Sequence, residues 1–128
     1  MTGALPEGFW DHFRRPRCVG RLDPCDREWE RQSPYCADRI RFTARFRGRR
    51  VEEVRFLAQG CSVLIAAASA AAEAAAGKPL AELIQRDVGF LLEALGPLPA
   101  RKRRCAAFAW SAMQDGLRGR DPIPEEEE

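Results

Sequence analysis

Two stretches near the middle of the chain alternate apolar and charged residues with a period of two. In residues 39–47 every even-numbered position from Ile40 to Phe46 is apolar, and arginines occupy most of the odd-numbered positions. Residues 51–59 repeat the pattern, with Val54 and Phe56 on one face. Gly48 lies between them. The pattern predicts an antiparallel hairpin with one buried face and one arginine-bearing face in water.

Helical patterns surround this hairpin. They cover residues 9–15, ended by Pro16, and an alanine-rich stretch at 62–76, followed by Gly77. Three more cover residues 80–85, 88–95 and 100–117, and weaker extended segments lie at 19–22 and 28–32. The order predicts an α+β fold, a small antiparallel sheet with helices packed on one face. We expect a single domain over 1–120 and a disordered acidic tail over 121–128.

Composition narrows the function class. The 128 residues are 45% hydrophobic and 31% charged, which is ordinary for a globular domain. The longest apolar stretch, residues 63–76, contains Ser69 and Glu73 and is shorter than the roughly 20 residues of a membrane span. We therefore expect a cytoplasmic protein without a membrane partner. Net charge is +2, and the scattered arginines do not favour nucleic acid as a partner.

The five cysteines carry the candidate chemistry. Their odd number and the lack of a secretion signal argue against a disulfide framework, and no two form a CxxC pair. Cys36, Cys61 and Cys105 fall at the ends of predicted elements, and Asp38 follows Cys36 by two positions. Thiols near helix starts have lowered pKa values, and thiolates bind zinc, iron and iron–sulfur clusters. Burial as small apolar residues is the alternative for each of them.

Five segments occur in a familiar order: DHFRRPRCVG at 11–20, SPYCAD at 33–38, FLAQGCSVLIAAAS at 56–69, GKPLAEL at 77–83 and RCAAFAW at 104–110. Over about residues 9–117 the chain resembles the IscU/NifU/SufU family of iron–sulfur cluster assembly scaffolds. The distinctive features are the Pro-x-Cys-x-Asp segment, the Gly-Cys before a small-residue helix, and a cysteine after a basic run.

The resemblance implies a four-ligand site made of Cys36, Asp38, Cys61 and Cys105. In that family the site holds zinc or an assembling [2Fe–2S] cluster. A cysteine desulfurase delivers sulfur to it, and recipient apo iron–sulfur proteins take the cluster. Cys105 and Cys36 are the candidate sulfur acceptors. Because a carboxylate is a harder ligand than a thiolate, we expect Asp38 to make the site releasable.

Three functions remain open. The first is a non-enzymatic scaffold that builds and transfers a [2Fe–2S] cluster. The second is a zinc-dependent sulfurtransferase like SufU, favoured by Arg104 and the segment at 105–110; the 44 positions between Cys61 and Cys105 lack the insertion of SufU-like chains. The third is a divergent domain with structural zinc, favoured by Ala37 where the family usually has glycine.

Other residues have simpler interpretations. Cys18 stands where similar chains have asparagine, and with Cys25 it is extra to the ligand set. The only histidine, His12, is expected to pack within the first helix, and the tryptophans to be core or interface. The basic run at 101–104 fits either a solvated helix end or a dock for an acidic partner such as the desulfurase.

Overall fold

A computed structural model describes residues 5–34 and 37–119. The chain forms five helices and three strands within these ranges: α1 (Glu7–Arg14), β1 (Arg27–Gln32), β2 (Arg39–Arg47), β3 (Arg50–Gln59), α2 (Ser62–Ala75), α3 (Leu80–Leu83), α4 (Gly89–Leu95) and α5 (Ala100–Arg118). The expected acidic tail lies outside the described residues. None of the described helices combines the length and apolar composition that a membrane span requires.

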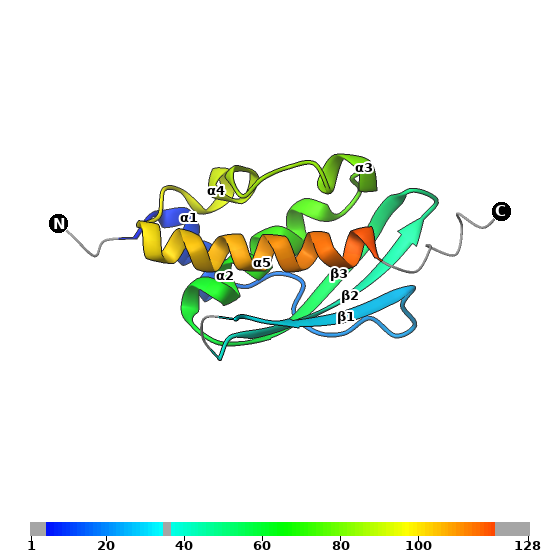
Figure 1. The fold of residues 1–128 in the computed structure, drawn as a ribbon, viewed down its shortest axis with the longest axis horizontal. Helices are drawn as coiled ribbons and strands as arrows, with labels where there is room; N and C mark the ends of the chain where they lie inside the picture. Colours follow the sequence, from blue (N-terminus) through cyan, green and yellow to red (C-terminus); the bar gives the residue numbers. More distant parts are fainter. Residues whose placement is uncertain (1–4, 35–36, 120–128) are drawn as a thin grey trace.

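The sheet is antiparallel with strand order β1-β2-β3. Ile40 pairs with Ala58 and Phe42 with Phe56, so the apolar sets of both strands lie on one face, as the alternation predicts. The register shifts between Arg45 and Phe46, an irregularity that the sequence pattern did not indicate. The α+β class and the helices on one face of the sheet are confirmed (Figure 1).

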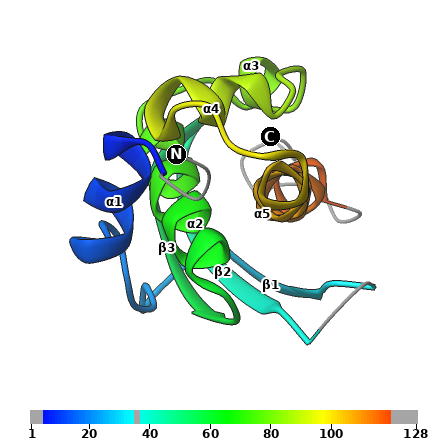
Figure 2. The ribbon, with the colours of Figure 1, turned by 90° about the vertical axis from the view of Figure 1, so that its left-hand side faces the viewer.

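Helix α2 is the centre of the helical layer. It follows β3 directly and contacts β3, α1, α4 and α5, and Figure 2 shows it lying between α1 and α5 above the sheet. Most of its residues are small and buried, including Ala66, Ala67 and Ala71. Because alanine leaves space for neighbouring backbones, α2 can be covered on several sides at once. The alanine-rich run therefore allows α2 to pack at a short distance from the sheet and from the neighbouring helices.

The outer face of the sheet is less exposed than the sequence pattern predicts. The chain between α1 and β1 crosses part of this face, where Leu22 is buried and its backbone N–H donates to the Thr43 hydroxyl, with an N···O distance of 2.9 Å. Thr43 itself is 1% exposed although it shares the arginine face of β2. This covering depends on a loop, and loop paths carry no periodic signal in the sequence.

The weak segment at 28–32 becomes the edge strand β1, which joins the sheet to α5. Trp29 is buried, and its indole N–H donates to the carbonyl of Ala112 at 2.8 Å. Gly116 on the next turn of α5 has no room for a side chain, because a Cβ there would overlap the Trp29 ring. The tryptophans Trp29 and Trp110 are core residues, as expected.

Candidate metal centre

Asp38 is held at the start of β2, facing the end of β3. Its backbone carbonyl accepts a hydrogen bond from the Ser33 N–H at 2.9 Å, which closes the β1–β2 connection. The residue is 8% exposed, unusually low for an aspartate. Buried carboxylates are ordinarily paired or bound to a cation, so its position points to a ligand role.

Cys61 and Cys105 come from two different elements to meet Asp38. Cys61 is the residue before the first turn of α2, directly after β3, and is exposed. Cys105 lies in the second turn of α5 and is half-buried. In Figure 1 the starts of α2 and α5 lie at the same end of the molecule. Residues separated by 44 positions in the sequence are therefore neighbours in space.

The three side chains form one donor cluster. Cys61 Sγ lies 3.9 Å from Cys105 Sγ and 3.7 Å from Asp38 Oδ2, and the three donor atoms all lie within 4.8 Å of one another. In a tetrahedral zinc site with Zn–S bonds near 2.3 Å, neighbouring sulfurs are separated by about 3.8 Å. The donor set therefore fits a thiophilic ion without a large rearrangement.

The fourth predicted ligand, Cys36, lies outside the described residues. Its neighbours in the sequence are described on both sides: Ser33 and Pro34 follow β1, and Ala37 precedes Asp38. The structure thus brings together three of the four predicted ligands, while the place of Cys36 stays a prediction.

Gly60 makes space for Asp38, a role that the sequence analysis missed. A Cβ at this position would overlap the Asp38 carboxylate and come within 2.8 Å of Leu64 Cδ2. Only glycine allows β3 to end this close to the carboxylate while the next residue supplies a ligand. The available signal was the Gly-Cys pair at a predicted strand end, which indicates close backbone approach.

Cys18 and Cys25 are not part of this cluster. Among residues 5–34 and 37–119, Asp38, Cys61 and Cys105 make up the one group of three or more candidate metal ligands. Cys18 is half-buried, and burial raises the pKa of its thiol, with a further contribution from Glu73. A thiol of this kind is a weak nucleophile at neutral pH.

His12 has the structural role expected of it. It is 5% exposed on α1, and its Nδ1 lies 2.7 Å from the Ser69 hydroxyl of α2. Burial, followed by the nearby charge of Arg17, lowers its pKa. The histidine therefore fastens α1 to α2 and contributes no ligand to the cluster.

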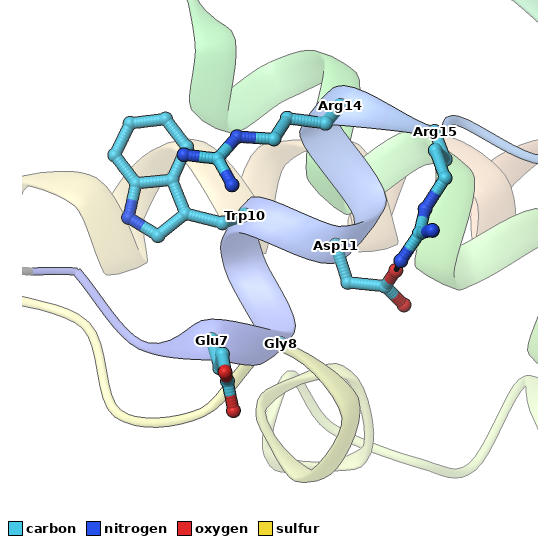
Figure 3. Close-up of a pocket in the computed structure, with 6 residues that line it drawn as sticks. All are labelled: Glu7, Gly8, Trp10, Asp11, Arg14 and Arg15. Atoms are coloured by element: carbon cyan, nitrogen blue, oxygen red, sulfur yellow. Dashed lines mark hydrogen bonds and ion pairs between the residues drawn. The ribbon is translucent and has the colours of Figure 1, made fainter.

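A separate hollow runs along the outer side of α1 (Figure 3). The Arg14 guanidinium carbon lies 4.9 Å from the Trp10 ring centre, and Arg15 pairs with Asp11 at 2.7 Å. No thiol lines this hollow, so its chemistry does not match that of the donor cluster.

The fold and the donor cluster together define a small α+β protein with a candidate site for a thiophilic ion where the sheet meets the starts of two helices. The family model for the NifU-like N terminal domain matches residues 7–120. The chain belongs to this family.

Three relatives illustrate its range. The iron–sulfur cluster assembly scaffold protein IscU 1 of Archaeoglobus fulgidus is 33% identical over 108 residues, covering 84% of this chain and 71% of the relative. IscU of Aquifex aeolicus is 34% identical over 120 residues, covering 92% and 76%. The zinc-dependent sulfurtransferase SufU of Bacillus subtilis is 30% identical over 126 residues, covering 84% of each.

Solved structures agree with the fold. The N-terminal part of a NifU-like protein from Brucella abortus superposes with a TM-score of 0.70 at 18% identity, covering 96% of this chain and 94% of that one. A putative scaffold protein for the SUF system from Fervidobacterium islandicum gives 0.71 at 17% identity, covering 88% and 95%. At these identities the likeness concerns the fold.

Proposed function

We propose that this chain is an iron–sulfur cluster assembly scaffold that accepts sulfur from a cysteine desulfurase and transfers the assembled [2Fe–2S] cluster to recipient apoproteins. The observation that carries the proposal is the convergence of Asp38, Cys61 and Cys105 within 4.8 Å. Family membership and the IscU and NifU names among the relatives support it. Cys36 completes the proposed ligand set.

The chemistry of sulfur acceptance follows from the thiolates. A thiolate of this chain attacks the outer sulfur of the donor's persulfide, the donor S–S bond breaks, and the donor cysteine leaves as a thiolate. Cys105 and Cys36 are the acceptors proposed from the sequence, and the exposure of Cys61 makes it a third thiol to test. Conversion of that sulfur to sulfide in a cluster needs two electrons from an external reductant.

Asp38 gives the site its proposed releasable character. A purely structural zinc site usually has four Cys or His ligands and stays closed. Here a carboxylate oxygen replaces one soft ligand, and oxygen is the poorer match for an iron–sulfur cluster. Exchange of the Asp38 oxygen therefore opens a coordination position for incoming sulfur or for a thiolate of the recipient.

The test is anaerobic reconstitution with ferrous iron, cysteine, a reductant and a cysteine desulfurase, followed by visible absorption. We expect cluster absorption in the wild-type chain and in Cys25→Ser, the matched control for loss of a thiol outside the cluster. We expect its loss in Cys105→Ser and slower release to an apo-ferredoxin in Asp38→Ala. Wild-type protein that keeps zinc and never develops the absorption would contradict the scaffold.

A zinc-dependent sulfurtransferase is the second candidate, favoured by Arg104 and by the 30% identity to SufU. Since 84% of this chain is about 108 residues, the 126 positions aligned with SufU leave about 18 of them without a counterpart in this chain. The 44 positions between Cys61 and Cys105 favour the scaffold as the first candidate. Desulfurase turnover that rises with the zinc form alone, without cluster formation, would support the second candidate.

A further inference from the structure

Positive charge is compensated by neighbouring carboxylates over most of the described surface. Arg41, for example, lies 2.8 Å from Glu30, and Arg45 lies 3.0 Å from Glu53. Other arginines with a carboxylate within 4.0 Å include Arg15, Arg17, Arg21, Arg31, Arg39, Arg47, Arg55, Arg86 and Arg118. These pairs are distributed over the sheet and over three helices, so most arginine charges on the described surface are balanced by a carboxylate of the same chain.

The first turn of α5 is different. Arg101, Lys102 and Arg103 follow one another there, and we call them the basic turn. Arg101 and Arg103 are exposed. Within residues 5–34 and 37–119, no carboxylate forms an ion pair with any of the three. Two exposed arginines and the half-buried Lys102 between them therefore have no carboxylate partner in the described part of the chain.

This arrangement is unfavourable for the helix itself. The N-terminal turn of a helix carries the positive end of the dipole and favours acidic residues, and α5 has none in its first turn. Like charges this close together also repel one another. The basic turn thus lowers the stability of α5, which indicates a benefit that comes from outside the described fold.

The basic turn borders the donor cluster. Arg101 and Lys102 are four and three positions before Cys105, so they lie on the same side of α5 as that thiol. Cys105 in turn lies 3.9 Å from the exposed Cys61. A partner that contacts the basic turn is therefore placed beside the thiols.

We propose that the basic turn is a docking surface for a carboxylate-rich segment of the cysteine desulfurase that brings sulfur to the cluster. The inference rests on the proposed function and adds to it the surface and the charge of the contact. Carboxylates satisfy the three cations and remove their mutual repulsion, and electrostatic attraction raises the rate of encounter.

Charge complementarity also exists within the chain, because Glu125–Glu128 are acidic. Chain entropy argues against this occupant within one molecule. Helix α5 has 19 residues and is about 28 Å long, and its far end precedes Gly119. The nine residues 120–128 span at most about 30 Å. Their glutamates would reach the basic turn only if this segment ran back along most of α5 in an extended path, at high entropic cost.

The experiment uses the full zinc-loaded chain and a desulfurase already shown to pass sulfur to it. The test variant is Arg101→Gln/Lys102→Gln/Arg103→Gln. The control, Arg15→Gln/Arg47→Gln/Arg118→Gln, removes the same charge elsewhere. We expect the test variant to bind the desulfurase at least tenfold more weakly, measured by calorimetry, and its dissociation constant to lose most of its dependence on salt concentration. The dissociation constant of the control should stay within twofold of the wild-type value.

Two further readouts separate docking from damage to the site. Zinc content and the sulfur-transfer rate at saturating desulfurase should equal those of wild type, and the urea midpoint should be unchanged or higher. Equal weakening in both triple variants, or none in the test variant, would overturn the proposal. A third outcome would also overturn it: deletion of residues 125–128 tightens desulfurase binding in the wild-type chain but not in the test variant. That result would show that the chain's own glutamates occupy the basic turn. Absence of sulfur transfer from any desulfurase would instead contradict the proposed function.

Discussion

Cys18 shows how one backbone angle affects stability. Its φ is +65°, and it is the one non-glycine residue with positive φ in the described ranges. Left-handed conformations are costly for most residues and are more readily adopted by asparagine. The family resemblance places asparagine at this position, and the backbone angle of Cys18 supplies a physical reason for it.

We therefore predict that Cys18→Asn stabilises the fold by about 1 kcal/mol, measured as the free energy of unfolding in urea. The control is Cys18→Ala, which keeps the strained angle and loses the packing of the thiol, and should be no more stable than wild type. A gain of equal size in both variants would show that removal of the thiol, and not the backbone angle, is responsible.

Gly60 acts on the proposed site through Asp38. We predict that Gly60→Ala displaces the carboxylate and lowers zinc affinity about 10- to 100-fold, the range found for residues that orient metal ligands. Competition with a chromophoric chelator measures the affinity. In the Asp38→Ala background the same change should lower zinc affinity much less, because the carboxylate is already absent and only the contact with Leu64 Cδ2 remains. Additive losses would show that Gly60 acts by another route.

The contact between α1 and α2 depends on the protonation state of His12. The Ser69 hydroxyl accepts the Arg17 backbone N–H at 2.9 Å, so its own proton can be donated to His12 Nδ1. An Arg17 guanidinium nitrogen also faces Nδ1, at 3.2 Å. Nδ1 is therefore an acceptor and the imidazole is neutral. Protonation would break both contacts and place a second cation beside Arg17, although Asp11 and Glu73 offset part of this charge.

This geometry predicts a pH dependence with a definite sign. Because the folded-state pKa of His12 is below its ordinary value of 6.5, the unfolded chain binds the proton more readily. The stability contribution is complete above about pH 6.5 and is lost as the pH falls toward the lowered pKa. His12→Asn should be less stable at pH 7.5 and show a flatter stability profile below pH 6.5. Identical profiles for both proteins would exclude His12 as the titrating group.

Helix α2 explains why such local contacts matter. Its alanines bring the backbones of α1, α4, α5 and the sheet close together, and its first residue follows Cys61, a proposed ligand. A shift of α2 therefore moves a thiol of the proposed site. The periodicity predicted this helix and strands β2 and β3 to within one or two residues, because their patterns extend over many positions.

The proposed centre joins three parts of the fold that are distant in sequence: the start of β2, the β3–α2 junction and α5. A metal bound to the folded state alone stabilises that state by mass action. We predict that zinc at about 100 times its dissociation constant stabilises the wild-type chain by about 3 kcal/mol, and that a chelator reverses the effect. Thermal unfolding with and without zinc checks this. Cys61→Ser/Cys105→Ser should not respond, and a zinc-insensitive wild type would contradict the centre.

The sequence determined the identity of the donors, the α+β class and the elements with strong periodicity, because side-chain chemistry and burial pattern are local properties. The resemblance supplied the four-ligand set, of which Asp38, Cys61 and Cys105 converge in the structure. The folded chain alone decided that Gly60 must yield its side-chain space to Asp38, that Leu22 covers Thr43, and that most arginines find a carboxylate while the basic turn does not. The Gly60–Asp38 and Leu22–Thr43 contacts join residues more than 20 positions apart, and pairs such as Arg41–Glu30 depend on strand register. Contacts of these kinds leave no periodic trace along a single chain.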